Sequence, residues 1–215
     1  MNKVGFIGLG IMGAPMSRNL MKAGYPVMVF NRSRGPMEAA ARDGAEMAES
    51  LTQLAASCNV IFTMLPNSPQ VKEVVLGEGG IASAAKPGTL IIDMTSGAPG
   101  DSKDIYAALK NKDIHIIDAP VSGGEPMAIA GTLAIMVGGE KTDFERALPY
   151  LKAVGKTATW VGPIGSGNTC KLTNQVIVAI NIAGLAEGLM LAEKAGADTQ
   201  LVFEALKGGL SLIHI

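Results

Sequence analysis

Three short stretches of the 215-residue chain combine glycine with residue types that bind anions or transfer protons. A G-x-G-x-x-G run occupies residues 8–13, a Ser-Gly-Gly run occupies residues 122–124, and Lys171 follows a Gly-Ser-Gly run. Backbone N–H groups left bare by glycine suit a phosphate or a carboxylate, and a lysine can supply a proton. These residue types predict a phosphate site, a carboxylate site and a proton donor.

The first glycine run follows an apolar stretch, Val4–Ile7, and precedes a predicted helix. In that setting Gly8 makes a tight turn, Gly10 lets the backbone approach a pyrophosphate, and Gly13 lets helix and strand pack closely. The phosphates then meet the unpaired N–H groups at the start of the helix. A purely structural glycine turn is the alternative, but the flanking strand and helix favour dinucleotide binding.

The residues after the second predicted strand bear on which dinucleotide is bound. A site that prefers NAD usually has Asp or Glu about 20 residues after the glycines, whereas here Asn31, Arg32, Ser33 and Arg34 follow the strand. No carboxylate would repel a 2′-phosphate, and a guanidinium and a hydroxyl can bind one. The sequence therefore favours NADP(H), with NAD(H) possible; solvated loop charges at Arg32 and Arg34 are the alternative.

Lys171 lies near the start of a long apolar segment, with Asn174 and Gln175 three and four positions later. In a helix these side chains share one face. The positive end of the helix dipole disfavours an ammonium group there, which would lower its pKa toward that of a proton donor. A surface lysine is the alternative here, as an ordinary serine-glycine turn is for residues 122–124.

The elements that must position these residues alternate between short apolar strands and longer helical stretches, which is typical of a doubly wound parallel α/β sheet of the Rossmann type. Two strand ends, Met64-Leu65-Pro66 and Met94-Thr95-Ser96, are expected to line the crevice at the switch point of that sheet. The predicted strands are Val4–Ile7, Val27–Phe30, Val60–Met64, Leu90–Asp93, Ile114–Asp118, Leu133–Val137 and Thr159–Val161, with helices near 11–23, 35–43, 68–76, 101–110 and 142–152.

A turn-rich stretch at residues 162–167 ends this pattern. We predict a cofactor-binding domain over residues 1–162 and the beginning of an all-α domain over residues 163–215. That second part has a helix from Asn168 to about Ala195 and another over Thr199–Leu206, capped by Asp198 or Thr199. Two helices cannot enclose a core of their own, so they must pack on the first domain, on a second copy of the chain or on a missing part of the protein. We expect a homo-oligomer that forms through the helical domain.

Composition excludes several classes of function. Hydrophobic residues make up 48% of the chain, which excludes a disordered tail, while a net charge of -1 and 4% aromatic residues argue against a nucleic-acid partner. Two cysteines and two histidines in unrelated positions predict no metal site and no disulfide framework. Free thiols and the lack of a signal peptide predict a cytoplasmic protein. The apolar window Val176–Ala192 contains Asn181 and Glu187, which favours a buried helix over a membrane span.

Three segments, in matching order and spacing, resemble the signatures of the β-hydroxyacid dehydrogenase family. They are residues 6–19 (FIGLGIMGAPMSRN), 118–124 (DAPVSGG) and 165–171 (GSGNTCK). The resemblance runs from residue 3 to about residue 210. It implies an NAD(P)-dependent oxidoreductase that acts on CH–OH groups and reduces a small carboxylate-bearing semialdehyde to a hydroxy acid.

The resemblance also implies a role for individual residues. Lys171 would be catalytic, and either Asn174 or Gln175 would contact substrate, because many members have asparagine where Gln175 stands. The substrate carboxylate would be held by Ser122, Gly123 and Gly124. The cofactor would be held by Gly8, Leu9, Gly10, Ile11, Met12, Gly13, Asn31, Arg32, Ser33, Met64, Leu65, Pro66 and Thr95.

Tartronate semialdehyde, reduced to D-glycerate, is the substrate that the resemblance favours. Another reductase or dehydrogenase of the family, acting on 3-hydroxyisobutyrate, succinic semialdehyde or glyoxylate, is an alternative, as is a non-catalytic NADP-binding module. Family members normally continue through further helices that close the substrate cleft, whereas here the resemblance stops near Leu210. We therefore expect a truncated chain that binds cofactor, turns over weakly and self-associates through its exposed apolar helices.

Overall fold

The structure is a computed structural model that describes residues 3–209 of the chain. The end of the family resemblance near Leu210 lies outside these residues, as does His214, one of the two histidines for which no metal site is predicted. The chain divides into two compact units, Met1–Lys171 and Leu172–Ile215. The division falls nine residues after the predicted domain boundary, because the first turns of the long helix pack on the sheet.

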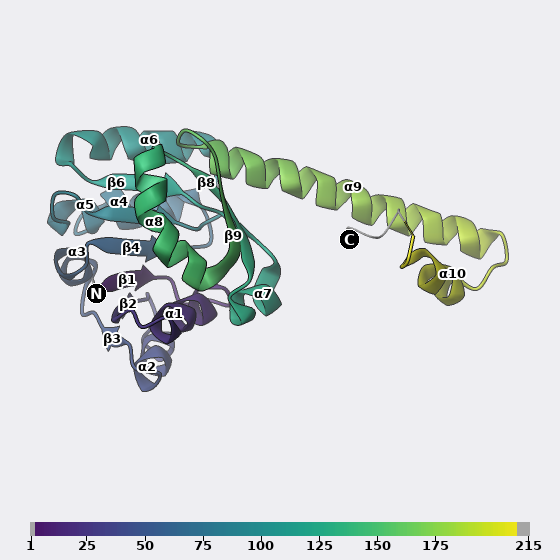
Figure 1. The fold of residues 1–215 in the computed structure, drawn as a ribbon, viewed down its shortest axis with the longest axis horizontal. Helices are drawn as coiled ribbons and strands as arrows, with labels where there is room; N and C mark the ends of the chain where they lie inside the picture. Colours follow the sequence, from purple (N-terminus) through teal and green to yellow (C-terminus); the bar gives the residue numbers. More distant parts are fainter. Residues whose placement is uncertain (1–2, 210–215) are drawn as a thin grey trace. The chain divides into compact units, whose positions relative to one another are not determined.

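The first unit is built on one mixed, mainly parallel sheet (Figure 1). Six neighbouring strands of the described residues run parallel in the order β3-β2-β1-β4-β5-β6. The order reverses between β1 and β4, which defines the switch point. The strands are β1 (Val4–Ile7), β2 (Val27–Phe30), β3 (Glu46–Met47), β4 (Val60–Thr63), β5 (Leu90–Asp93), β6 (His115–Asp118), β7 (Val121–Ser122), β8 (Leu133–Gly138) and β9 (Gly155–Gly162).

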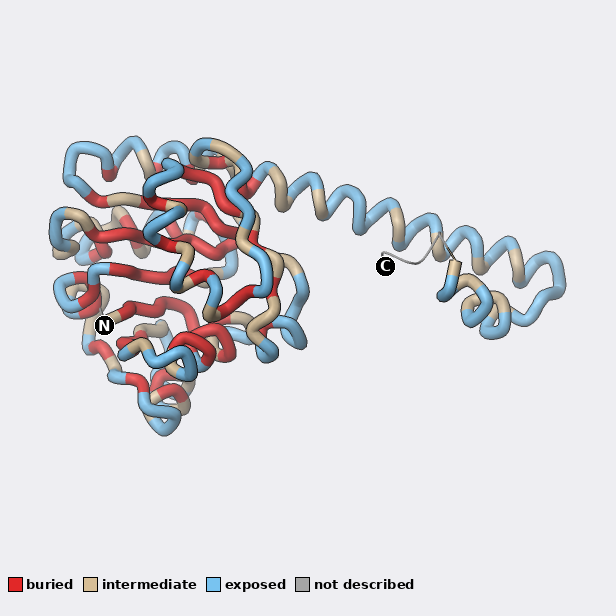
Figure 2. The backbone as a smooth tube through the Cα atoms, viewed as in Figure 1, coloured by how far each residue is buried: buried red, intermediate tan, exposed pale blue. Residues whose placement is uncertain are grey.

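Helices cover both faces of the sheet and enclose two apolar cores (Figure 2). One core lies under α1, α2, α7 and α8 and contains the stacked rings of Phe6 and Phe62; the other lies under α3 to α6. Burial on both faces explains why the central strands read as continuous apolar runs. The helices are α1 (Gly13–Lys22), α2 (Arg34–Arg42), α3 (Leu51–Ser57), α4 (Ser68–Leu76), α5 (Ile81–Ala84), α6 (Pro99–Leu109), α7 (Gly124–Ala130) and α8 (Lys141–Val154).

The predicted doubly wound α/β fold is confirmed, with additions that the sequence pattern did not indicate. Strand β8 pairs antiparallel with β6 and β7, and β9 is longer than the predicted Thr159–Val161. The short elements β3, α3, α5, β7 and α7 were not predicted. Helix α3 nevertheless carries a readable cap, since the Ser50 hydroxyl accepts the Gln53 N–H and the Gln53 amide oxygen accepts the Glu49 N–H.

The second unit holds most of α9 (Ser166–Lys194) and all of α10 (Thr199–Leu206). The Asp198 carboxylate caps α10 by accepting N–H groups of Gln200 and Leu201, which confirms the predicted cap. Within the described residues α9 is largely exposed, including Val176 and Ile180, so the predicted burial of its apolar window is absent. By length and composition α9 alone among the described helices could cross a membrane.

Candidate active site

The glycine loop after β1 has the three backbone properties that dinucleotide binding requires. Gly8 has a φ of +95°, and a Cβ there would lie 2.2 Å from the carbonyl oxygen of Met64. A Cβ at Gly13 would lie 1.9 Å from the carbonyl oxygen of Gly8, so helix and loop touch. A Cβ at Gly10 would meet nothing within 4 Å, which leaves its backbone open to a ligand.

The start of α1 is free to bind phosphate. Met12 is its N-cap residue, and no side chain caps this end of the helix. The N–H groups of a first helical turn lack partners within the helix, and the helix dipole attracts an anion to them. The open backbone at Gly10 and the uncapped helix fit the pyrophosphate of a dinucleotide.

Of the residues after β2, some are held by hydrogen bonds or an ion pair within the protein, and one is free to bind a ligand. The Asn31 amide accepts the Leu9 N–H at 3.1 Å and donates to the Ser33 hydroxyl at 2.9 Å, so it ties the glycine loop to this second loop. Arg34 forms an ion pair with Glu38 at 2.9 Å. Arg32 is exposed and makes no hydrogen bond or ion pair within residues 3–209. Arg32 is therefore available for a phosphate.

A buried carboxyl group orders the loops after β4 and β5. The Asp93 carboxylate accepts the Thr63 hydroxyl at 2.8 Å and the Thr95 N–H at 3.1 Å. The Thr95 hydroxyl in turn accepts the Leu65 N–H at 3.0 Å. Burial raises the pKa of Asp93 to about 6. This network holds Leu65 and Thr95, two of the residues predicted to bind the cofactor. Sequence reasoning assigned no role to Asp93, whose only signal is that it ends an apolar strand.

The predicted carboxylate cradle lies at β7 and the start of α7. Gly123 and Gly124 have φ values of +133° and +65°, and a Cβ at Gly123 would lie 2.4 Å from the Met127 sulfur. This backbone therefore requires glycine. The Ser122 hydroxyl makes no hydrogen bond with any described residue, which leaves it available for a ligand.

Lys171 is the last residue of the first compact unit and lies on the second turn of α9. The side chain is half-buried, and burial lowers its pKa. Among residues 3–209 it has no anionic partner to restore that pKa. Asn174 and Gln175 belong to the second unit, where the Asn174 amide donates to the Gln175 side-chain oxygen at 3.1 Å. Which of these two amides contacts substrate stays a prediction.

Sequence reasoning overlooked two polar residues that hold the start of α9. The Asp118 carboxylate accepts the N–H groups of Gly165 and Asn168, each at 2.7 Å. Asn168 is 1% exposed, although it directly follows the turn-rich stretch at residues 162–167. Burial raises the pKa of Asp118, against the opposing effect of the two N–H bonds. Both residues lie in the sequence motifs, but their role in holding the start of α9 is visible only from the tertiary contacts.

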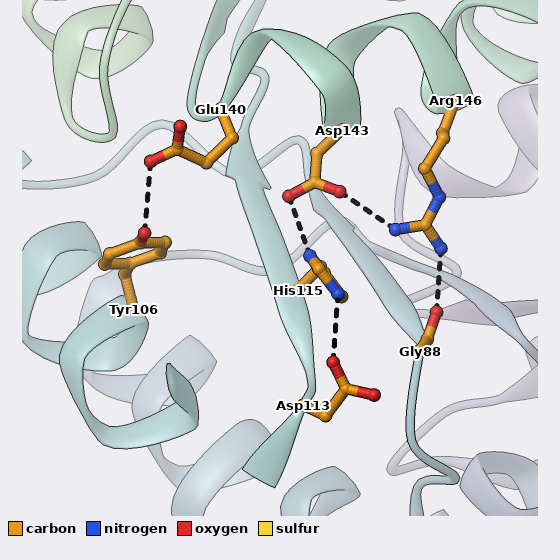
Figure 3. Close-up of polar contacts among 7 residues, drawn as sticks. All are labelled: Gly88, Tyr106, Asp113, His115, Glu140, Asp143 and Arg146. Carbon is orange, nitrogen blue, oxygen red and sulfur yellow. Dashed lines mark hydrogen bonds and ion pairs between the residues drawn. The ribbon is translucent and has the colours of Figure 1, made fainter. Parts of the chain in front are cut away.

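A second polar cluster lies away from these residues (Figure 3). Asp143 on α8 binds His115 at 2.9 Å and Arg146 at 2.9 Å, and Arg146 also donates to the Gly88 carbonyl oxygen at 2.7 Å. Gly88 and His115 lie at the amino ends of β5 and β6. Ligands of open α/β sheets bind at the carboxyl ends of the strands, so this cluster is structural.

The glycine loop, the switch point and the loops at the carboxyl ends of the strands define an NAD(P)-binding α/β domain. The model of the NAD binding domain of 6-phosphogluconate dehydrogenase matches residues 3–162. A second model, the NAD-binding domain of NADP-dependent 3-hydroxyisobutyrate dehydrogenase, matches residues 165–212. The chain belongs to the β-hydroxyacid dehydrogenase family, whose members include the 3-hydroxyisobutyrate dehydrogenases, as the sequence motifs predicted.

Individual relatives agree with this family. The chain is 45% identical over 214 residues to 2-hydroxy-3-oxopropionate reductase of Escherichia coli (strain K12) and covers 99% of its own length and 73% of that protein. A 3-hydroxyisobutyrate dehydrogenase structure from Mycobacterium tuberculosis, with L-serine, is 34% identical with a TM-score of 0.91, covering 98% of this chain and 72% of that one. A structure titled "Psf3 in complex with NADP+ and 2-OPP" is 28% identical, with a TM-score of 0.87 and coverage of 97% and 75%.

Proposed function

We propose that this chain reduces a small carboxylate-bearing semialdehyde to a hydroxy acid with NADPH, and that tartronate semialdehyde, which yields D-glycerate, is its substrate. The observation that carries the proposal is Lys171, a half-buried amine with no anionic partner among the described residues. Its helix is hydrogen-bonded to Asp118, four residues before Ser122. The 45% identity to 2-hydroxy-3-oxopropionate reductase supports this choice of substrate.

In this proposal, different residues of the chain bind the substrate carboxylate and donate the proton. When bound, the nicotinamide supplies the hydride that reduces the aldehyde carbon. The Ser122 hydroxyl and the N–H groups of Gly123 and Gly124 bind the substrate carboxylate and orient the aldehyde. Lys171 Nζ stabilises the negative charge that develops on the aldehyde oxygen and donates its proton to that oxygen. In the oxidative direction the neutral amine accepts the proton from the alcohol.

The preference for NADP(H) is part of the proposal. Arg32 is exposed and unpaired within residues 3–209, whereas Arg34 is held by Glu38. A free guanidinium can bind a 2′-phosphate in a bidentate manner. No acidic side chain lies at residues 31–34 to repel it.

The test is NADPH oxidation with tartronate semialdehyde, succinic semialdehyde and glyoxylate, each also assayed with NADH. We expect NADPH to be preferred and tartronate semialdehyde to give the highest kcat/KM. Lys171→Ala should lower kcat by about 10²-fold or more while the Kd for NADPH, measured by its fluorescence, stays near that of the parent chain. Retained turnover in this variant would remove the catalytic role of Lys171.

A non-catalytic NADP-binding module is the alternative function. The chain covers 73% of the length of the reductase from Escherichia coli, so the assay includes a second protein in which the remaining C-terminal part of that reductase is joined to this chain. Turnover by either protein supports the proposal. NADPH binding without turnover of any of the three substrates by both proteins would favour the binding module.

A further inference from the structure

The first turn of α9 is fixed against the sheet by its backbone. A Cβ at Gly167 would lie 2.5 Å from the carbonyl oxygens of both Asp118 and Met136, so the helix rests directly on β6 and β8. The Asp118 carboxylate also accepts the N–H groups of Gly165 and Asn168. These contacts satisfy the start of the helix and require nothing from the side chain of Asn168.

The Asn168 side chain makes a separate connection, to the loop that follows β5. Its amide oxygen accepts the Gly97 N–H at 2.9 Å, and its amide nitrogen donates to the Ser102 hydroxyl on α6 at 3.1 Å. The same loop is held from its other side, because the Ser68 hydroxyl accepts the Ala98 N–H at 2.8 Å. Gly97 follows Thr95 by two residues, so Asn168 connects α9 to the loop on which the nicotinamide side of the cofactor is proposed to rest.

The geometry leaves little freedom at this junction. A Cβ at Gly97 would lie 2.4 Å from the Ser68 hydroxyl oxygen, so a larger residue at this position would displace the Ser68 hydroxyl that binds the loop. Asn168 is 1% exposed and uses both a donor and an acceptor. Among side chains of this size, leucine can neither accept nor donate a hydrogen bond, and an ionised aspartate can accept but cannot donate.

Lys171 follows Asn168 by three residues, on the neighbouring part of the same helix face. A shift of the first turn of α9 therefore carries the ammonium group with it. We propose that Asn168 is a positioning residue, which holds Lys171 in register with the loop after β5 so that proton donor and cofactor meet the same carbonyl group. This inference rests on the proposed function for the role of Lys171, but the contacts of Asn168 can be tested without turnover.

The experiment measures the amine of Lys171 directly. Competitive labelling with acetic anhydride across a pH series, read by mass spectrometry of the peptide that contains Lys171, reports the pKa and the reactivity of that amine. The proteins are the parent chain, Asn168→Ala, Ser102→Ala and the control Asn19→Ala. Asn19 is another buried asparagine, and its amide donates to the Ala128 carbonyl oxygen at 2.8 Å.

We expect the pKa of Lys171 to rise toward its ordinary value in Asn168→Ala, because the loop after β5 is no longer held against the first turn of α9 and the amine gains water. Ser102→Ala removes only one of the two bonds and should give a smaller rise in the same direction. Asn19→Ala should leave the titration of Lys171 unchanged while lowering thermal stability. Trp160 fluorescence, from the single tryptophan, verifies that each variant is folded.

An unchanged titration of Lys171 in a folded Asn168→Ala protein would overturn the proposal, as would an equal shift in the Asn19→Ala control. If Asn168→Ala does not fold, an unchanged titration of Lys171 in folded Ser102→Ala would overturn the proposal in the same way. Where turnover is measurable, kcat should fall by about 10²-fold with little change in the KM for NADPH. Absence of turnover in the parent chain would count against the proposed function, whereas the labelling result would still decide the role of Asn168.

Discussion

The buried carboxyl group of Asp93 should make the stability of the sheet unit depend on pH. Burial raises the pKa of Asp93 from its ordinary 3.8 to about 6, and the neighbouring Asp118 acts in the same direction. Above pH 6 the native state must hold a buried negative charge that the unfolded chain exposes to water. We predict that replacing this group in Asp93→Asn removes that dependence.

The sign and the size follow from proton linkage. Between pH 4 and pH 6 the native state binds more protons at Asp93 than the unfolded state does, so the free energy of unfolding falls as the pH rises. A pKa change from 3.8 to about 6 corresponds to about 3 kcal/mol, fully lost by about pH 7. In Asp93→Asn one amide oxygen can still accept the bonds from Thr63 and Thr95, but no proton is exchanged.

Urea unfolding at a series of pH values, followed by Trp160 fluorescence, measures the free energy for the unit that contains β9. The stability of Asp93→Asn minus that of the parent should grow by about 2–3 kcal/mol between pH 4 and pH 7. An unpaired N–H₂ group on the new amide costs about 1–3 kcal/mol at every pH, which shifts the whole curve without altering this trend. Asp104→Asn, which removes an exposed carboxylate from α6, is the control. A stability difference that does not change with pH would refute the reasoning.

Two further predictions concern the cofactor. Arg32→Ala should raise the Kd for NADPH by about tenfold and leave the Kd for NADH nearly unchanged, because a charged hydrogen bond to a phosphate contributes about 1.5–3 kcal/mol. Arg34→Ala is the matched control. Equal losses of affinity for NADPH and NADH in Arg32→Ala would contradict the assignment. Gly13→Ala should lower the free energy of unfolding by about 1–3 kcal/mol, because its Cβ would meet the Gly8 carbonyl oxygen at 1.9 Å. Gly10→Ala, whose Cβ would meet nothing within 4 Å, should weaken NADPH binding and leave the free energy of unfolding unchanged. A loss of stability in Gly10→Ala would show that the surroundings of Gly10 are not open.

Local patterns in the sequence predicted the elements that are long or strongly apolar. Strands β1, β2 and β5 have the predicted bounds, and so does helix α10, because buried runs and an aspartate cap are encoded by adjacent residues. Strand β7 and helix α7 were missed, since a two-residue strand and a glycine-started helix depend on pairing with β8 rather than on their own periodicity.

The candidate site was predictable to a similar extent. Motifs indicated the residues that we propose to bind ligands, such as the glycine loop and Lys171, because their chemistry is visible in residue type and spacing. The residues that hold them, Asp93, Asp118 and Asn168, act through partners on other elements. A single sequence contains no signal for those partnerships, and only the fold brings them together.

The anchoring of α9 also has a consequence for the order in which the protein folds. The bonds of Asp118 and Asn168 join residues that are 47, 50, 66 and 71 positions apart in the chain. Contacts of such sequence separation carry a large loop-closure cost, so they form late, after the local helices and neighbouring strands. On a ribosome, the carboxyl ends of β5 and β6 emerge well before the segment that they must hold. The placement of Lys171, the proposed proton donor, against the loop after β5 is therefore expected to arise with the last cooperative step of folding, and not with the formation of the helix that carries it.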